Sequence, residues 1–198
     1  MNTALLLSGG MDSTSIAYWK RPSLAITIDY GQKPAYAETR AAASVCKDLN
    51  IKHHIIRVDV ASLGSGDMAG TPAITIAPVS EWWPFRNQLL ITLAAMHGVT
   101  ANIGTLMVGT LTSDGAHVDG TQRFLNAMDQ LLKMQEGGIR LEAPAVHLNG
   151  AGLVRKSGIP MDILGWAHSC HVANQACGVC RGCRKHYETL AELGLDPY

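Results

Sequence analysis

Residues that could do chemistry first gather in a glycine-rich turn near the start of the sequence, LLLSGGMDST (Leu5–Thr14). Its two glycines let the backbone approach an anion closely, and the first N–H groups of the helix that follows carry a partial positive charge. The string matches neither the lysine-containing nucleoside-triphosphate loop nor the G-x-G-x-x-G fingerprint. It predicts a phosphate site without a loop lysine. The alternative is a plain tight turn in which Asp12 or Ser13 caps the helix.

A second group of reactive side chains is a cluster of four cysteines, Cys170, Cys177, Cys180 and Cys183. The C-x2-C spacings suit thiolates on one tetrahedral zinc ion, and an odd total of five cysteines does not resemble an extracellular disulfide framework. We therefore predict one structural Zn²⁺ that orders an otherwise irregular segment. Cys46, outside the cluster, is expected to be a small buried apolar residue.

Three other interpretations of the cysteine cluster stay open. Successive C-x2-C spacings also occur in iron–sulfur proteins, although no proline follows the last cysteine here. A redox role would need a free thiol, which four ligands on one metal do not leave. A histidine could replace one cysteine ligand, and the candidates are His168, His171 and His186.

These groups must be positioned by alternating strand and helix patterns. Apolar and β-branched runs predict strands at residues 4–7, 23–31, 53–60, 102–110 and 138–144. Helix-forming segments are predicted at 13–20, 35–49, 87–97, 122–135 and 184–192. The alternation indicates an α/β fold: a Rossmann-like, five-stranded parallel sheet with helices on both faces, followed by a zinc-binding segment.

Two stretches fit neither pattern. The small and glycine-rich residues 61–78 predict a loop or flap beside the sheet, and the alternation breaks down at 154–170. We divide the chain into a phosphate-binding α/β domain at 1–165 and a zinc-binding segment at 166–198.

The bulk composition bounds the class of partner. The 198 residues suit one domain, and 16 basic side chains balance 16 acidic ones. Neither nucleic acid nor a membrane surface is indicated by this charge balance, and no apolar run approaches the roughly 18 residues of a membrane span. We expect a cytoplasmic protein that acts on a small molecule.

The string LSGGMDS resembles the pyrophosphate-binding loop of the N-type ATP pyrophosphatases, which cleave ATP between its α and β phosphates and adenylate a substrate oxygen. The resemblance implies that the loop holds the leaving pyrophosphate together with Mg²⁺, which accounts for the missing lysine. By this resemblance the ATP-binding residues are Leu7, Ser8, Gly9, Gly10, Met11, Asp12, Ser13, Thr14, Asp29 and Gln32.

Further strings resemble the 7-cyano-7-deazaguanine synthase family of the queuosine pathway. They are IDYGQ followed by Glu38, PFRNQLLITLAA, and CHVANQACGVCRGCRKH followed by GLDP. The resemblance implies that ATP and ammonia convert 7-carboxy-7-deazaguanine to the nitrile, through an acyl-adenylate and an amide. It also implies zinc at the four cysteines and, as is common among relatives, a homodimer.

The same resemblance suggests roles for individual side chains. Asp12, Arg86 and Lys156 are expected to be catalytic, the last two as cations beside the α phosphate. Simpler alternatives are a surface arginine, a solvated lysine and aspartates that merely solvate a loop. Residues expected to bind the substrate are Tyr30, Arg86, Asn87, Asp114 and Asp119.

One segment departs from the family pattern. Where that family carries a Tyr-Pro-Asp-Cys string, this chain reads GTLTSDGAHVDGTQRF, which keeps Asp114 and Asp119 as acceptors for a guanine-like edge. A divergent member could stop at the amide or use another amine, in a defence or nucleic-acid modification system. A decayed nucleotide-binding module is a third hypothesis, against which the intact glycine-rich turn speaks.

Overall fold

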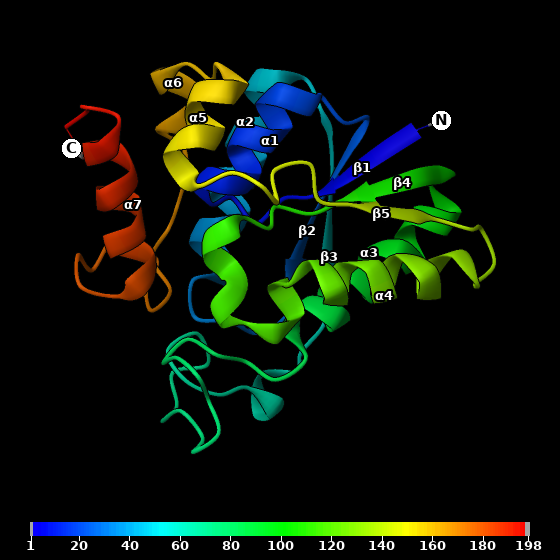
Figure 1. Cartoon of the computed structure of the whole chain (residues 1–198), viewed down its shortest axis with the longest axis horizontal. Helices are drawn as coiled ribbons and strands as arrows, with labels where there is room; N and C mark the ends of the chain where they lie inside the picture. The colour runs from blue at the N-terminus through cyan, green and yellow to red at the C-terminus, as the bar shows by residue number, and fades with distance from the viewer. Residues whose placement is uncertain (1, 197–198) are drawn as a thin grey trace.

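The computed structural model describes residues 2–196, apart from the side chains of Ser113 and Ala116. Five parallel strands form one sheet in the order β3-β2-β1-β4-β5 (Figure 1). The predicted fold class is therefore confirmed. The strands are β1 (Asn2–Leu6), β2 (Leu24–Asp29), β3 (Lys52–Arg57), β4 (Ile103–Met107) and β5 (Arg140–Glu142).

Helices cover both faces of the sheet. They are α1 (Met11–Lys20), α2 (Ala35–Leu49), α3 (Arg86–Thr100), α4 (Gln122–Lys133), α5 (Gly150–Ser157), α6 (Met161–Leu164) and α7 (Arg181–Glu192). Short 3-10 turns are η1 (Ala61–Leu63), η2 (Thr112–Ala116) and η3 (Val118–Gly120).

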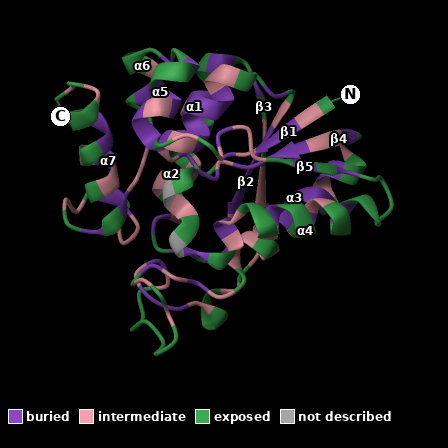
Figure 2. Cartoon of the chain, in the orientation of Figure 1, coloured by how far each residue is buried: buried purple, intermediate pink, exposed green. Residues whose placement is uncertain are grey.

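The alternation of side chains along each strand divides the core in two. In β1, Ala4 joins a core with Ile91 of α3 and Leu125 of α4, whereas Leu5 joins a core with Ile16 of α1 and residues of α2 and α5. Both strand residues are fully buried. Figure 2 shows buried stretches along β1 and β4 and on helix α1. Successive side chains of a strand point to opposite faces of the sheet, and this alternation determines which helices pack on which face. The loops that follow the strands then meet at the edge of the sheet where the strands end.

The segment after β5 corrects the sequence prediction, because α5 and α6 occupy much of the stretch where no pattern was found. Asn149 caps α5 by accepting from Gly152 N at 2.8 Å, and Leu153 packs into the core below α1. Glycines disfavour a helix in isolation, so this one depends on a cap and on burial, which periodicity does not reveal.

The loop prediction is confirmed. Residues 58–85 contain only η1 and turns, and they lie below the sheet in Figure 1, between the end of β3 and the start of α3. The backbone of this loop pairs with itself, for example from Asp67 N to Ser80 O at 2.8 Å. In the part of the chain that the structure describes, every helix is too short or too polar to span a membrane.

Candidate active site and metal centre

A cavity of about 330 Å³ opens at the carboxyl ends of β1, β2 and β4, the edge at which open parallel sheets bind ligands. Its walls come from the turn after β1, the start of α3, the η2–η3 segment and the start of α7. The structure brings most of the predicted site residues together here. Those lining the cavity are Leu7, Ser8, Gly10, Met11, Asp12, Ser13, Tyr30, Gln32, Arg86, Asn87, Asp114 and Asp119.

The glycine-rich turn presents a helix N-terminus to the cavity. Gly10 is the N-cap of α1, and no side chain caps this end, so Asp12 and Ser13 are not the cap. The helix begins at Met11, two residues before the predicted start. Because its first N–H groups lack a side-chain partner, they are available to an anion.

Hydroxyl groups line the same turn. Ser8 Oγ lies 3.1 Å from Ser13 Oγ and accepts from Gly10 N at 3.3 Å. Gly9 has a φ of +78°, and a side chain there would bring its Cβ to 2.4 Å from the carbonyl oxygen of Glu38. Gly9 therefore shapes the turn and does not itself line the cavity.

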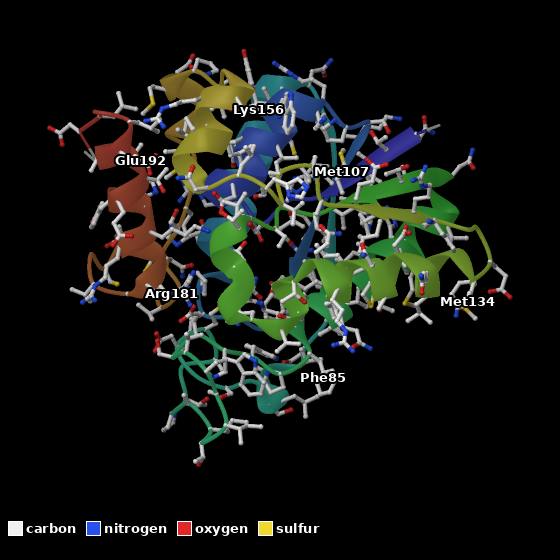
Figure 3. The ribbon with its side chains drawn as sticks, viewed as in Figure 1. Phe85, Met107, Met134, Lys156, Arg181 and Glu192 are labelled. Carbon is white, nitrogen blue, oxygen red and sulfur yellow. The ribbon has the colours of Figure 1, made fainter. Side chains whose placement is uncertain are left out.

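Besides Gly9, three residues predicted for the site do not line the cavity. Thr14 is fully buried, and its Oγ1 has no hydrogen-bond partner among the described residues. Asp29 Oδ1 accepts from Gly31 N at 3.2 Å, so its carboxylate supports the turn that follows β2. Lys156 is exposed on α5, with Nζ 5.1 Å from the centre of the Trp19 ring (Figure 3). None of the three lines the cavity.

A lysine that the sequence did not single out lies beside the turn instead. Lys185 Nζ of α7 donates to Asp12 Oδ2 at 2.8 Å and to Asp114 Oδ1 at 3.3 Å. Burial acts to lower the pKa of Lys185, but the two carboxylates outweigh it and raise that pKa. Burial raises the pKa of Asp12, against the opposing effect of Lys185. The ammonium group stays charged at neutral pH.

The end of β2 forms a buried polar wall. Gln32 accepts from Tyr30 N and donates to Glu38 Oε2, both at 2.8 Å. Burial raises the pKa of Glu38 to about 7, although the bond from Gln32 and the charge of Arg86 oppose the shift. The ring of Tyr30 packs edge-on against Trp83 with centroids 5.0 Å apart. Glu38 also lines the cavity, so its carboxyl group titrates close to neutral pH beside the candidate site.

The start of α3 is tied to the η2–η3 segment. Asn87 N donates to Asp119 Oδ2 and Asn87 Nδ2 donates to the Asp119 carbonyl, each at 3.1 Å. The neighbouring Arg86 contacts Met68 Sδ through Nη1 at 2.9 Å. A thioether is a weak acceptor, so the guanidinium keeps donors for an anionic ligand.

A buried ionic contact joins the 58–85 loop to α7. Glu81 Oε1 accepts from Arg181 Nη1 at 2.6 Å and lies 3.5 Å from His117 Nε2. Although burial of the Glu81 side chain opposes ionisation, hydrogen bonds from His117 and its own backbone and the Arg181 charge lower the pKa of Glu81 to about 2. All three side chains line the cavity, and the sequence alone gave no signal for them.

The four cysteines converge on one point. Their Sγ atoms all lie within 4.8 Å of one another, with 3.9 Å between Cys177 and Cys183 and 4.0 Å between Cys170 and Cys180. Ligands about 2.3 Å from a tetrahedral zinc are about 3.8 Å apart, so the set fits a single ion. In a [4Fe–4S] cluster each thiolate binds a different iron, and in a [2Fe–2S] cluster the four thiolates are divided between two irons, so in both the sulfurs are spread further than around one ion.

The nearby histidines do not belong to this set. His168 Nε2 lies 3.0 Å from the carbonyl oxygen of Ala173, and His186 Nδ1 lies 3.0 Å from Ser169 Oγ. Among the described residues, the metal-binding group contains the four cysteines and no histidine. Cys46 is buried in the core, as predicted.

Sequence similarity to 7-cyano-7-deazaguanine synthases extends over nearly the whole chain. 7-cyano-7-deazaguanine synthase 1 of Desulfitobacterium hafniense is 29% identical, over 94% of this chain and 90% of its own. The 7-cyano-7-deazaguanine synthases of Methanoculleus marisnigri and Anaeromyxobacter dehalogenans are 29% and 30% identical, over 96% and 98% of this chain and 94% and 93% of their own.

Solved structures support the fold. The U34-tRNA thiolase NcsA of Methanococcus maripaludis, described with its [4Fe-4S] cluster, superposes with a TM-score of 0.52 at 16% identity, over 98% of this chain and 66% of its own. NMN synthetase of Francisella tularensis superposes with a TM-score of 0.50 at 15% identity, over 98% of this chain and 78% of its own.

The model of the family described as queuosine biosynthesis protein QueC matches residues 2–194. The chain therefore belongs to the QueC family.

Proposed function

We propose that this chain is an ATP-dependent ligase that converts 7-carboxy-7-deazaguanine and ammonia to 7-cyano-7-deazaguanine. The observation that carries the proposal is one cavity in which the open N-terminus of α1 faces a wall containing Arg86 and the Asn87–Asp119 pair. The helix N-terminus can bind the phosphates, and the wall opposite offers polar groups to a small heterocycle. The names of the relatives support this choice of substrate.

The chemistry explains why a phosphate site is needed. A carboxylate repels nucleophiles and has no tolerable leaving group, and adenylation removes both obstacles. A carboxylate oxygen attacks the α phosphorus and pyrophosphate leaves; ammonia then displaces AMP and loses a proton, giving an amide. The amide oxygen then attacks the α phosphorus of a second ATP and pyrophosphate leaves, and loss of AMP and of both amide protons gives the nitrile. Each adenylation moves one substrate oxygen into AMP.

The proposed roles follow from position. Ser8, Gly10 and Ser13 hold the leaving pyrophosphate, and Leu7 and Met11 complete that wall. The carboxylate of Asp12 is a hard oxygen ligand suited to the Mg²⁺ that accompanies ATP. Arg86 supplies positive charge to the α phosphate. Gln32 keeps its predicted role in binding ATP, and Tyr30, Asn87, Asp114 and Asp119 frame the deazapurine.

For the cysteine cluster we propose Zn²⁺ as the metal, because the sulfur spacing fits one tetrahedral ion. A closed set of four thiolates leaves no position for substrate, so the ion acts structurally. We also retain the expectations of a homodimer, of a cytoplasmic location and of no direct contact with nucleic acid.

Product analysis tests the proposal. The protein is incubated with ATP, Mg²⁺, ammonium and 7-carboxy-7-deazaguanine, and the products are measured by mass spectrometry. We expect AMP and a compound of nitrile mass, both dependent on ammonium. A reaction that ends at the amide would overturn nitrile synthesis, and no AMP under any condition would leave a nucleotide-binding module.

A further inference from the structure

Lys185 is the cation that lies beside the glycine-rich turn. Among the residues that the structure describes, three Lys or Arg side chains line the cavity: Arg86, Arg181 and Lys185. Arg181 forms an ion pair with the buried Glu81. Arg86, at the start of α3, contacts Met68. Within the described residues, only Lys185 of the three has a recorded contact with a residue of the turn, Asp12 at 2.8 Å.

Lys185 carries one positive charge and lies beside two carboxylate groups. Its ammonium group holds two carboxylates, Asp12 and Asp114, and uses two of its three N–H donors for them. Its side chain is 37% exposed, so a ligand in the cavity can reach it. A carboxylate oxygen is a ligand that suits Mg²⁺, so Mg²⁺ bound to ATP would compete with Lys185 for Asp12. Lys185 would then be free to donate hydrogen bonds to phosphate oxygens.

We propose that Lys185 is a catalytic residue that binds the triphosphate of ATP and stabilises the charge collecting on pyrophosphate as it leaves, an inference that rests on the proposed adenylation. In the step, a carboxylate oxygen of the substrate forms a bond to the α phosphorus. The bond from the α phosphorus to the bridging oxygen breaks, and its electron pair leaves with pyrophosphate. Lys185 keeps its proton and donates hydrogen bonds throughout.

The cysteine cluster positions this lysine. Cys180 is the N-cap of α7, where its Sγ accepts from Cys183 N at 3.4 Å, and Lys185 follows two residues after Cys183. Gly182 packs so closely that a Cβ there would lie 1.9 Å from the carbonyl oxygen of Ser169. One turn later, Thr189 Oγ1 donates to the Lys185 carbonyl at 2.7 Å. The metal centre therefore supports the reaction through the helix that starts on it.

Variants of Lys185 test the proposal. K185M and K185Q remove the charge, K185R keeps it, and K133M removes a lysine that pairs with Asp129 on the surface of α4. We expect K185M and K185Q to lower the rate of pyrophosphate release about 100-fold, with metal content and melting temperature unchanged. K185R should retain more than about a tenth of the rate, and K133M should match the unaltered protein. A K185M rate within threefold of the unaltered protein would overturn the role.

Binding measurements separate this proposal from the adenylation on which it rests. The probes are Mg²⁺ with α,β-methylene ATP, which cannot release pyrophosphate, and adenosine. K185M should weaken the triphosphate analogue about tenfold and leave adenosine unchanged. If the unaltered protein released no pyrophosphate, the proposed function would fail and these affinities would still decide the role of Lys185. Equal weakening of both probes, or of neither, would overturn it.

Discussion

At the scale of residues, Asp12 is the point where the turn, α7 and the η2 segment meet. It is the second residue of α1, beside the open helix N-terminus, and accepts a hydrogen bond from the ammonium group of Lys185. D12N keeps the shape of the side chain and removes the charge needed for Mg²⁺. We expect a loss of adenylation of about 100-fold or more, measured as pyrophosphate release. D162N, on the exposed first turn of α6, is the matched control, and equal rates for the two variants would remove Asp12 from the site.

Lys156 gives the opposite prediction. Sequence reasoning made it a catalytic cation, but its side chain is exposed on α5 and lies over Trp19. K156A should change pyrophosphate release by less than about twofold, because surface substitutions away from a site have small effects. A large loss of rate in K156A with an unchanged melting temperature would restore the residue to the site.

The carboxyl group of Glu38 should make stability depend on pH. Its pKa in the folded protein is about 7, above its ordinary value of 4.5. The folded state therefore binds a proton more tightly than the unfolded state, so this contribution to stability is complete below about pH 4.5 and is lost as pH rises through about 7.

Substitution by glutamine isolates this effect. E38Q stays neutral at every pH and can still accept the hydrogen bond from Gln32. The melting temperature of E38Q relative to the unaltered protein should be higher at pH 8.5 than at pH 5, by about 2–4 °C for each kcal/mol relieved. The same difference at both pH values would contradict the raised pKa of Glu38.

At the scale of elements, the contact between Glu81 and Arg181 connects the 58–85 loop to α7. The loop has no strand and only one short 3-10 turn, so contacts made by its side chains hold it in place. We expect E81Q to speed amide hydrogen exchange in residues 64–84, with little change in β1 or β4. Unchanged exchange in the loop would mean that its own backbone pairs, such as Asp67 with Ser80, are sufficient.

The elements also show what could be read from the sequence. The strands, α2 and the cysteine ligands were predictable because their signals are local: an apolar period, a run of helix formers, a fixed spacing. Lys185 was not, because its partner Asp12 lies 173 residues away along the chain and only folding brings them together. Helix α5 was missed because its glycines hide a helix that burial of Leu153 supports.

At the scale of the whole molecule, the metal centre and the reaction are joined by α7. We predict about one zinc ion per chain by elemental analysis. Removal of the metal by a chelator should abolish pyrophosphate release, because α7 would lose its N-terminal anchor and Lys185 its position. Iron in a natively purified preparation would contradict the metal assignment, and full activity after removal of the metal would contradict the link through α7.

The five-stranded parallel sheet explains why the cavity lies at the carboxyl ends of the strands. The proposed chemistry explains why the cavity must bind a triphosphate. The proposed chemistry requires that both oxygens of the carboxylate leave as part of AMP. Labelling both carboxylate oxygens of 7-carboxy-7-deazaguanine with oxygen-18 tests this directly by mass spectrometry. We expect two AMP for each nitrile, each AMP carrying one labelled oxygen. Unlabelled AMP, or ADP with the label in inorganic phosphate, would contradict it.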